Sequence, residues 1–210
     1  CTGALDLIFS VDRSASIADD EYFATISAID NIINQFSLDD GIGHGYDEVR
    51  VGVQTFNDEQ QVLKQLNDFT TDIGDLTLIA PSGGTDIAAS LDQISSVMFT
   101  EDNGDRLKPH NENVVVLLTD GHTSGTPMQP ANVDRLIVVG IGSSPEDNLS
   151  DLASIPDDYM QVNNTCGIIS FLQERLLCND TAVSMNSSLC FDFEERNATA
   201  TNFTTNFMTF

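Results

Sequence analysis

Basic residues are scarce in this chain: its 210 residues include 8 lysines and arginines against 33 aspartates and glutamates. The formal net charge of −25 excludes a nucleic-acid surface that works through phosphate contacts, and it argues against adsorption to an anionic membrane. Apolar runs are short as well, and none approaches the roughly 20 residues that a transmembrane helix requires. The composition therefore favours a protein of a cation-rich aqueous medium, although acidity that only maintains solubility is the simpler alternative.

Cysteine is the next residue in short supply, and its spacing excludes two common uses. The four cysteines contain no CxxC pair, which argues against zinc-ribbon and thioredoxin-like sites. The chain also lacks an HExxH motif for a catalytic zinc ion. An even number of cysteines suits two disulfides formed in an oxidising compartment, so we expect an extracellular protein.

Six Asn-x-Ser/Thr sequons predict asparagine-linked glycosylation, and four of them fall within the last 32 residues. The six sites are Asn148, Asn163, Asn179, Asn186, Asn197 and Asn202. Because the chain opens at Cys1 without methionine, we expect a mature form or a fragment, either secreted or part of a larger ectodomain.

Short apolar runs alternate with amphipathic segments through most of the chain. Strands are expected at 4–11, 48–56, 61–66, 113–120, 135–142 and 159–162, and helices at 19–36, 70–79, 85–99, 144–155 and 167–177. This alternation predicts a doubly wound α/β fold, in which a mainly parallel six-stranded sheet has helices on both faces.

The alternation stops at Cys178, which divides the chain into two parts. Residues 1–178 form the predicted α/β domain. Residues 179–210 are rich in Thr, Asn and Ser, and their phenylalanines are too widely spaced to build a core. We expect an irregular C-terminal tail there, either a glycosylated linker or the start of a truncated neighbouring domain.

Oxygen-bearing side chains lie in three loops of the predicted fold: after the first strand, at the start of the helix expected at 85–99, and at the end of the strand expected at 113–120. They are Asp12, Ser14, Ser16, Thr85 and Asp120. In a doubly wound sheet, ligands bind outside the carboxyl ends of the strands, where these loops should meet. Two carboxylates and three hydroxyls make a hard oxygen site suited to Mg²⁺, Ca²⁺ or Mn²⁺. Because hydroxyls carry no charge, such an ion would stay positive enough to accept an external carboxylate.

Each of these motifs also has a simpler explanation. Ser16 and Thr85 could be helix N-caps, and the Asp120–Gly121 pair could be only a turn. The convergence of all three loops at one predicted edge of the sheet favours the metal site.

Four segments carry a family resemblance: LDLIFSVDRSASI, VRVGVQTF, PSGGTDIAASL and VVVLLTDG. They resemble the signature segments of the von Willebrand factor type A domain, which integrin I domains share, in consistent order and spacing from Cys1 to about Cys178. The resemblance implies a metal-ion-dependent adhesion site, with Mg²⁺ as the favoured ion and Ca²⁺ or Mn²⁺ as alternatives.

The resemblance also assigns roles within that site. Its DxSxS motif, its loop threonine and its third-loop aspartate correspond to Asp12, Ser14, Ser16, Thr85 and Asp120. In this family the third-loop aspartate reaches the ion directly or through water, and a vacant coordination position takes a Glu or Asp of the ligand.

Two residues beside the motif are candidate ligand contacts. Arg13 and Ala15 stand where the family often has glycine, and Arg13 would either favour acidic ligands or compete with them. His122 follows Asp120 by two residues and would line the binding surface, unless it is merely an exposed loop histidine.

The resemblance further implies a disulfide pattern. Extracellular members of the family tie the two ends of the domain together, which implies a bond between Cys1 and Cys178. Cys166 would then pair with Cys190 at the start of the tail. Four cysteines allow three connectivities, so the other two pairings stay open.

These features predict an extracellular adhesion or matrix module, which binds an acidic side chain of a protein ligand through a divalent cation. The alternative is a structural unit of an extracellular polymer or filament, with subunit contacts through the tail. An enzyme is not expected, because no base or nucleophile accompanies the predicted ligands.

Overall fold

The computed structural model describes residues 4–36, 38, 48–70, 80–106, 108, 111–121, 126–142 and 149–177. Within them, six strands form one sheet in the order β3-β2-β1-β4-β5-β6. The strands are β1 (Ala4–Asp12), β2 (Val49–Phe56), β3 (Gln60–Lys64), β4 (Asn111–Thr119), β5 (Arg135–Ile141) and β6 (Tyr159–Val162). All neighbouring pairs are parallel except β2 and β3, which form an antiparallel hairpin. The predicted doubly wound, mainly parallel fold is therefore confirmed.

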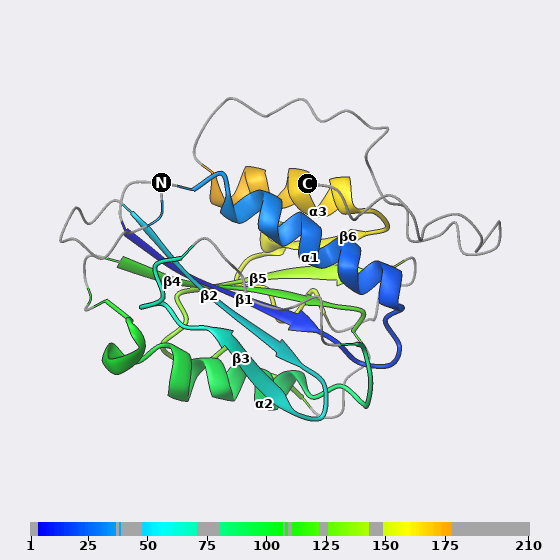
Figure 1. Cartoon of the computed structure of the whole chain (residues 1–210), viewed down its shortest axis with the longest axis horizontal. Helices are drawn as coiled ribbons and strands as arrows, with labels where there is room; N and C mark the ends of the chain where they lie inside the picture. Colours follow the sequence, from blue (N-terminus) through cyan, green and yellow to red (C-terminus); the bar gives the residue numbers. More distant parts are fainter. Residues whose placement is uncertain are drawn as a thin grey trace.

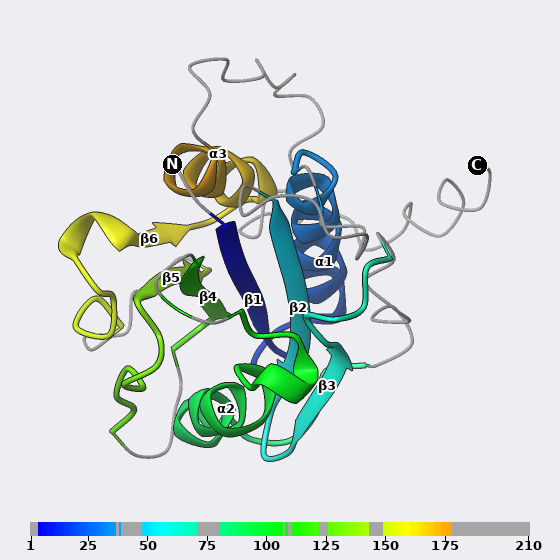
Figure 2. The same cartoon turned by 90° about the vertical axis from the view of Figure 1, so that its left-hand side faces the viewer.

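Helices cover both faces of this sheet (Figures 1 and 2). Helices α1 (Asp19–Ile33) and α3 (Thr165–Leu176) lie together on one face, above the sheet in Figure 1. Helix α2 (Ile87–Gln93) lies on the other face and continues into a π-helical turn, η2 (Ile94–Met98). Two 3₁₀ turns complete the elements, η3 (Glu101–Asn103) and η4 (Pro156–Asp158). None of the described helices is long and apolar enough to cross a membrane.

The central strand β1 is buried on both sides, which explains its nearly continuous apolar sequence. Successive side chains of a strand point to opposite faces. Leu7 and Phe9 accordingly join the apolar cluster beneath α1 and α3, whereas Ile8 joins the cluster beneath α2. One strand therefore contributes to both halves of the core.

The amino end of β1 carries a buried ion pair. The Asp6 side chain is fully buried and lies 2.6 Å from the Arg106 guanidinium. Asp6 also accepts hydrogen bonds from the backbone amide of Arg106 and from Asn111, both at 2.8 Å. Arg106 in turn donates to the carbonyl oxygens of Leu5 and Glu48. This network joins β1, β4 and the segment before β4 at the end of the sheet opposite the predicted metal site.

Several predicted elements differ from the structure. The helix expected at 144–155 is wrong over its described part, because residues 149–155 form turns and bends. The helix expected at 85–99 begins later and changes to π geometry at Ile94. Helix α1 ends at Ile33, three residues before the expected end. The helix expected at 70–79 falls almost entirely outside the described residues, as do Cys178 and the tail 179–210, so the domain boundary stays a prediction.

Loss of the Asp6 carboxylate should destabilise the fold strongly. In Asp6→Ala the guanidinium of Arg106, whose side chain is only 12% exposed, keeps its charge without its buried partner. We expect the free energy of unfolding to fall by about 3–5 kcal/mol in chemical denaturation. The exposed Asp30→Ala on α1 is the matched control and should change it by less than about 0.5 kcal/mol. Equal, small effects of the two substitutions would contradict a structural role for the pair.

Candidate metal centre

Three loops meet at the carboxyl-terminal edge of the sheet, toward the right of Figure 1. The first loop follows β1 and is joined to the other segments by backbone hydrogen bonds. The Arg13 amide donates to Phe56 O at 2.8 Å, and the amide of Ser82 donates to Arg13 O at 2.7 Å. Ala15 donates to Gly83 O at 3.0 Å. The first and second loops are therefore held in register before any side chain is considered.

The carboxylate of Asp12 is the centre of the site. Asp12 is fully buried at the end of β1. Its Oδ1 accepts from the backbone amide of Ser14 at 2.8 Å, and its Oδ2 accepts from the hydroxyl of Thr119 at 2.6 Å. Both oxygens are thereby oriented by neighbouring strands and loops.

Burial makes the charge of Asp12 costly. It raises the pKa of Asp12 from its ordinary 3.8 to about 6; hydrogen bonds from Thr119 and Ser14 oppose this rise, and the nearby charge of Asp120 adds to it. A divalent cation beside the two aspartates would stabilise the ionised form. The donor set therefore fits a hard cation.

Hydroxyl groups lie directly beside this carboxylate. Ser14 is buried, and its Oγ lies 2.9 Å from Oγ of the exposed Ser16. Thr85, in the second loop, is 9% exposed, and Asp120, in the third, is half-buried. The uncharged hydroxyl oxygens of Ser14 and Ser16 thus lie at hydrogen-bonding distance from each other, next to Asp12.

The simpler explanations for the serine and threonine are wrong. Ala18 is the N-cap of α1, and Asp86 is the N-cap of α2, where its carboxylate accepts from Ala89 N at 2.9 Å. Neither Ser16 nor Thr85 therefore caps a helix. Gly121, directly after Asp120, lies in a bend with a φ of +94°. Residues 122–125 lie outside the described residues, so the turn expected after Asp120 stays a prediction.

The second loop is supported by the β2–β3 turn. Asn57 Nδ2 donates to Ser82 O at 2.6 Å, and Gly84 N donates to Asp58 Oδ2 at 2.7 Å. A Cβ atom on Gly84 would lie 2.5 Å from Asp58 Oδ1, and Gly83 has a φ of +77°. Glycine is therefore favoured at position 83 by its backbone conformation, whereas a side chain at position 84 would displace the Asp58 carboxylate.

Thr119 is the functional neighbour that the sequence analysis missed. Its fully buried hydroxyl donates to Asp12 and accepts from Gly121 N at 3.1 Å. It therefore connects the first loop to the third. The sequence shows only a threonine at the end of a buried strand. Threonine is β-branched and common in strands, so its position alone did not mark it as a partner of Asp12.

Of the two candidate ligand contacts, Arg13 and His122, the structure describes only Arg13. Arg13 is only 8% exposed, and its Nε has no hydrogen-bond partner among the described residues. Its charge acts on Tyr22 of α1, where it opposes the burial that raises the pKa of the phenol to about 12. The side chain is thus buried near α1, and its ligand role stays a prediction. His122 lies outside the described residues.

Within the described part of the chain, no three His, Cys, Asp or Glu side chains cluster as a metal site would require. A site at this edge must therefore draw on the hydroxyls. Cys166 is disulfide-bonded, and its partner is one of the three cysteines outside the described residues, so the pairing stays a prediction. Of the six sequons, only that of Asn163 is fully described.

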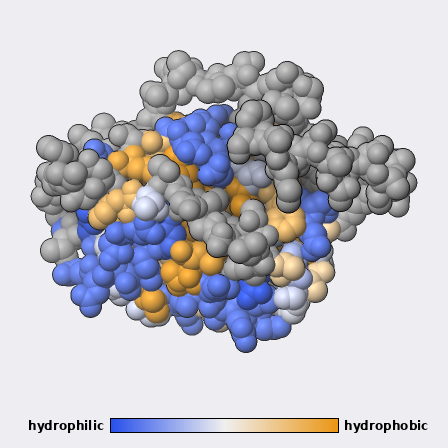
Figure 3. All heavy atoms as spheres, in the orientation of Figure 1, coloured by the Kyte–Doolittle hydropathy of each residue, from blue (hydrophilic) through white to orange (hydrophobic). Residues whose placement is uncertain are grey.

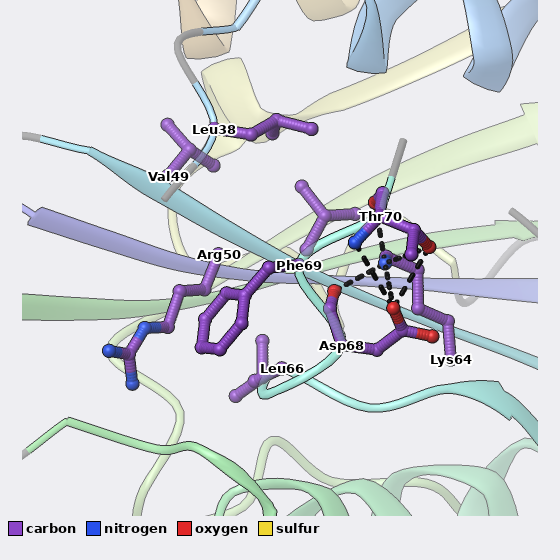
Figure 4. Close-up of a pocket in the computed structure, with 9 residues that line it drawn as sticks. Leu38, Val49, Arg50, Lys64, Leu66, Asp68, Phe69 and Thr70 are labelled. Carbon is purple, nitrogen blue, oxygen red and sulfur yellow. Dashed lines mark hydrogen bonds and ion pairs between the residues drawn. The ribbon is translucent and has the colours of Figure 1, made fainter. Parts of the chain in front are cut away.

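A separate small pocket lies beside β2 and β3 (Figure 4). Lys64 lines this pocket. Its ammonium group is already occupied by hydrogen bonds within the fold, because Nζ donates to the carbonyl oxygens of Asp68 and Thr70. The guanidinium of Arg50 lies 5.5 Å from the centre of the Phe69 ring and donates to Gly104 O. On the face shown in Figure 3, apolar residues show in the middle with hydrophilic residues below them. The polar groups of the pocket therefore stabilise the fold and offer no second site.

The von Willebrand factor type A domain model matches residues 6–171 of this chain. The chain belongs to this family. Among the curated relatives of this von Willebrand factor A domain, the mouse collagen alpha-5(VI) chain is 25% identical over 87% of this chain, and the human collagen alpha-6(VI) chain is 28% identical over 85%. Human cochlin is 28% identical over 75%.

The von Willebrand factor A domain spans only part of these relatives. It covers 7% and 8% of the two collagen VI chains and 28% of cochlin. The relatives are extracellular matrix proteins, and with the disulfide at Cys166 they place the domain outside the cell.

Solved structures support the same fold. Proximal thread matrix protein 1 from the mussel byssus has a TM-score of 0.68 at 21% identity, covering 83% of this chain and 47% of that one. The TRAP protein of Plasmodium vivax has a TM-score of 0.59 at 20% identity, covering 83% and 74%. At such identities the likeness shows the fold alone.

Removal of the Thr119 hydroxyl should loosen Asp12 without emptying the core. Thr119→Val keeps the shape of the side chain but leaves Asp12 Oδ2 and Gly121 N without their partner. We expect thermal denaturation with chelator present to show a loss of about 1–3 kcal/mol. Thr119→Ser, which keeps the hydroxyl, should retain most of the stability. Equal losses in both variants would show that the methyl group matters rather than the hydrogen bonds.

Asp12 also predicts how the stability of the metal-free domain depends on pH. Between pH 4 and 6 the folded state binds the Asp12 proton more tightly than the unfolded state, so stability falls as the pH rises. With chelator present, Asp12→Asn should therefore be more stable than wild type by about 2–3 kcal/mol at pH 7.5, and the difference should vanish near pH 4. Denaturation at both pH values measures this, and a constant difference would contradict the assigned burial cost.

Proposed function

We propose that this domain is an extracellular adhesion or matrix module that binds a protein ligand through a divalent cation. The proposed ligand set is Asp12, Ser14, Ser16, Thr85 and Asp120. The observation that carries the proposal is the fully buried Asp12 carboxylate, oriented by Thr119 and placed beside two hydroxyls at the carboxyl edge of the sheet.

The donor chemistry and the structural neighbours both support a divalent cation. Carboxylate and hydroxyl oxygens suit Mg²⁺, which is our favoured ion, and also Ca²⁺ or Mn²⁺. A crystal structure of the mussel thread protein has zinc in its metal-ion-dependent adhesion site, and the Plasmodium vivax protein was solved loaded with manganese.

Each residue has a distinct task in this proposal. Asp12 supplies negative charge from a fixed position, and the Ser14 and Ser16 hydroxyls add oxygens without adding charge. Thr119 positions Asp12 and the third loop. When bound, the ion would supply an electrophilic coordination position for an acidic side chain of the ligand. The net charge of −25 repels such a ligand only weakly, because physiological salt screens charges beyond about 8 Å.

The approach of a protein ligand would bring it over the third loop. His122 follows Asp120 by two residues and is the proposed contact there, whereas Arg13 in its buried position contributes charge rather than surface. We propose no catalytic role, because the relatives are matrix proteins and the described residues at this edge include no nucleophile with a partnered base.

Calorimetric titration tests the metal site directly. Chelator-treated protein should bind Mg²⁺, Ca²⁺ or Mn²⁺ with one-to-one stoichiometry, and Asp12→Ala should lose this binding. Asp30→Ala removes the same charge from an exposed position of α1 and should bind like wild type. Binding that survives in Asp12→Ala would refute the proposed ligand set.

A second candidate function is a structural unit of an extracellular polymer. The observation in its favour is that the collagen VI chains and the mussel thread matrix protein are matrix components. In this alternative the tail 179–210 follows a folded domain of residues 1–178 and contacts other subunits. Asp12→Ala distinguishes the two functions, since loss of ligand binding with intact assembly supports adhesion, and loss of assembly supports the structural role.

A further inference from the structure

The sequon at Asn163 lies at the end of an edge strand. Asn163 directly follows β6, the outermost strand on its side of the sheet. Its side chain is exposed. Its Oδ1 accepts from Asn164 Nδ2 at 3.0 Å, while its own Nδ2 makes no hydrogen bond within the described part of the chain. The atom that a glycan would modify is therefore not engaged by a hydrogen bond to any described residue.

The neighbouring residues of the sequon have structural tasks that Asn163 does not share. Asn164 is the N-cap of α3, where its Oδ1 accepts from Gly167 N at 2.8 Å. Thr165 is the first residue of α3 and is 8% exposed. Asn163 can therefore carry a bulky group without disturbing the start of the helix.

Strand β6 has few of the usual protections of a sheet edge. Exposed edges are commonly protected by charged residues, proline, bulges or a covering segment. The sequence of β6, YMQV, contains neither charge nor proline, and within the described residues it pairs only with β5. Met160 in its middle is 39% exposed, and the preceding Ile155 is 50% exposed. The short length of the strand is its main intrinsic protection.

We propose that Asn163 carries an N-linked glycan that covers the edge of β6 left unpaired among the described residues and keeps two copies of the domain from pairing there. The proposal does not depend on the metal site. The observation behind it is the position of an exposed sequon at the end of an uncharged edge strand with exposed apolar side chains.

The modification has to precede folding. Nδ2 of Asn163 would form a bond to the anomeric carbon of a lipid-linked oligosaccharide diphosphate. The bond from that carbon to the diphosphate oxygen breaks, the lipid diphosphate leaves, and Nδ2 loses one proton. The transferring enzyme must also reach Thr165, which is only 8% exposed in the folded domain. In this proposal the glycan is therefore added before the segment folds.

Occupancy is tested on the full chain secreted from eukaryotic cells. Release of N-glycans by an amidase in ¹⁸O-water converts a glycosylated asparagine to ¹⁸O-labelled aspartate, which peptide mass spectrometry detects. We expect the label at Asn163 in most molecules and its loss in Asn163→Gln. Thr165→Ser keeps the sequon and should keep the glycan. An unlabelled Asn163 in the wild-type protein would refute the proposal.

The role of the glycan is tested by light scattering over a concentration series. Asn163→Gln should self-associate at least about tenfold more tightly than the glycosylated wild type. Adding Met160→Lys to Asn163→Gln places a charge on the bare edge and should restore the wild-type behaviour. Denaturation of each variant verifies that the fold is retained.

The outcomes separate the possible explanations. Self-association that Met160→Lys abolishes supports protection of the β6 edge. Self-association that persists with Met160→Lys places the contact elsewhere and overturns the proposed role. No increase in self-association of a folded Asn163→Gln also overturns it.

Discussion

The buried carboxylate of Asp12 is the constraint on which the arrangement of the carboxyl-terminal edge of the sheet depends. Its two oxygens are held by the Ser14 amide and the Thr119 hydroxyl, so the first loop and the ends of β1 and β4 are held together. The second loop is held separately, by backbone bonds to the first loop and by the turn that contains Asn57. An oxygen site at this edge is therefore largely pre-organised by the protein alone.

The two ends of β1 use buried aspartates in opposite ways. Asp6, at the amino end, has its charge matched by Arg106 and its oxygens bonded to Asn111 and backbone. Asp12, at the carboxyl end, has hydrogen bonds but no cationic side chain to lower its pKa. The first arrangement stabilises the domain by itself. The second leaves an electrostatic cost that an external cation would relieve, which is how a folded protein can retain a binding site at the expense of stability.

The outer strands of the sheet raise a different question from its carboxyl end, namely how their exposed backbone groups are protected from pairing with other chains. A sheet with helices on both faces leaves its two outer strands, β3 and β6, each paired on one side only among the described residues. On one side the outer strand is β3, and its pairing with β2 shifts in register between Val53 and Gln54. On the other side β6 is short and contains no charged residue, so it lacks one of the usual protections of a sheet edge. In the proposal above, the glycan at the following Asn163 supplies that protection.

The sequence by itself determined the fold class and the proposed ligand set. Buried strands read as apolar runs. DRSAS and Asp120 lie at the ends of parallel strands whose carboxyl ends must meet at one edge, and Thr85 lies just before a helix, so these local patterns have a fixed topological consequence. It failed at residues 149–155, where a helical pattern forms turns, and it missed Thr119. Only the tertiary structure decided that Arg13 is buried near α1 and that Thr119 reaches Asp12. The Thr119–Asp12 hydrogen bond joins two strands whose residues lie 107 positions apart in the chain, and no local pattern specifies such a contact.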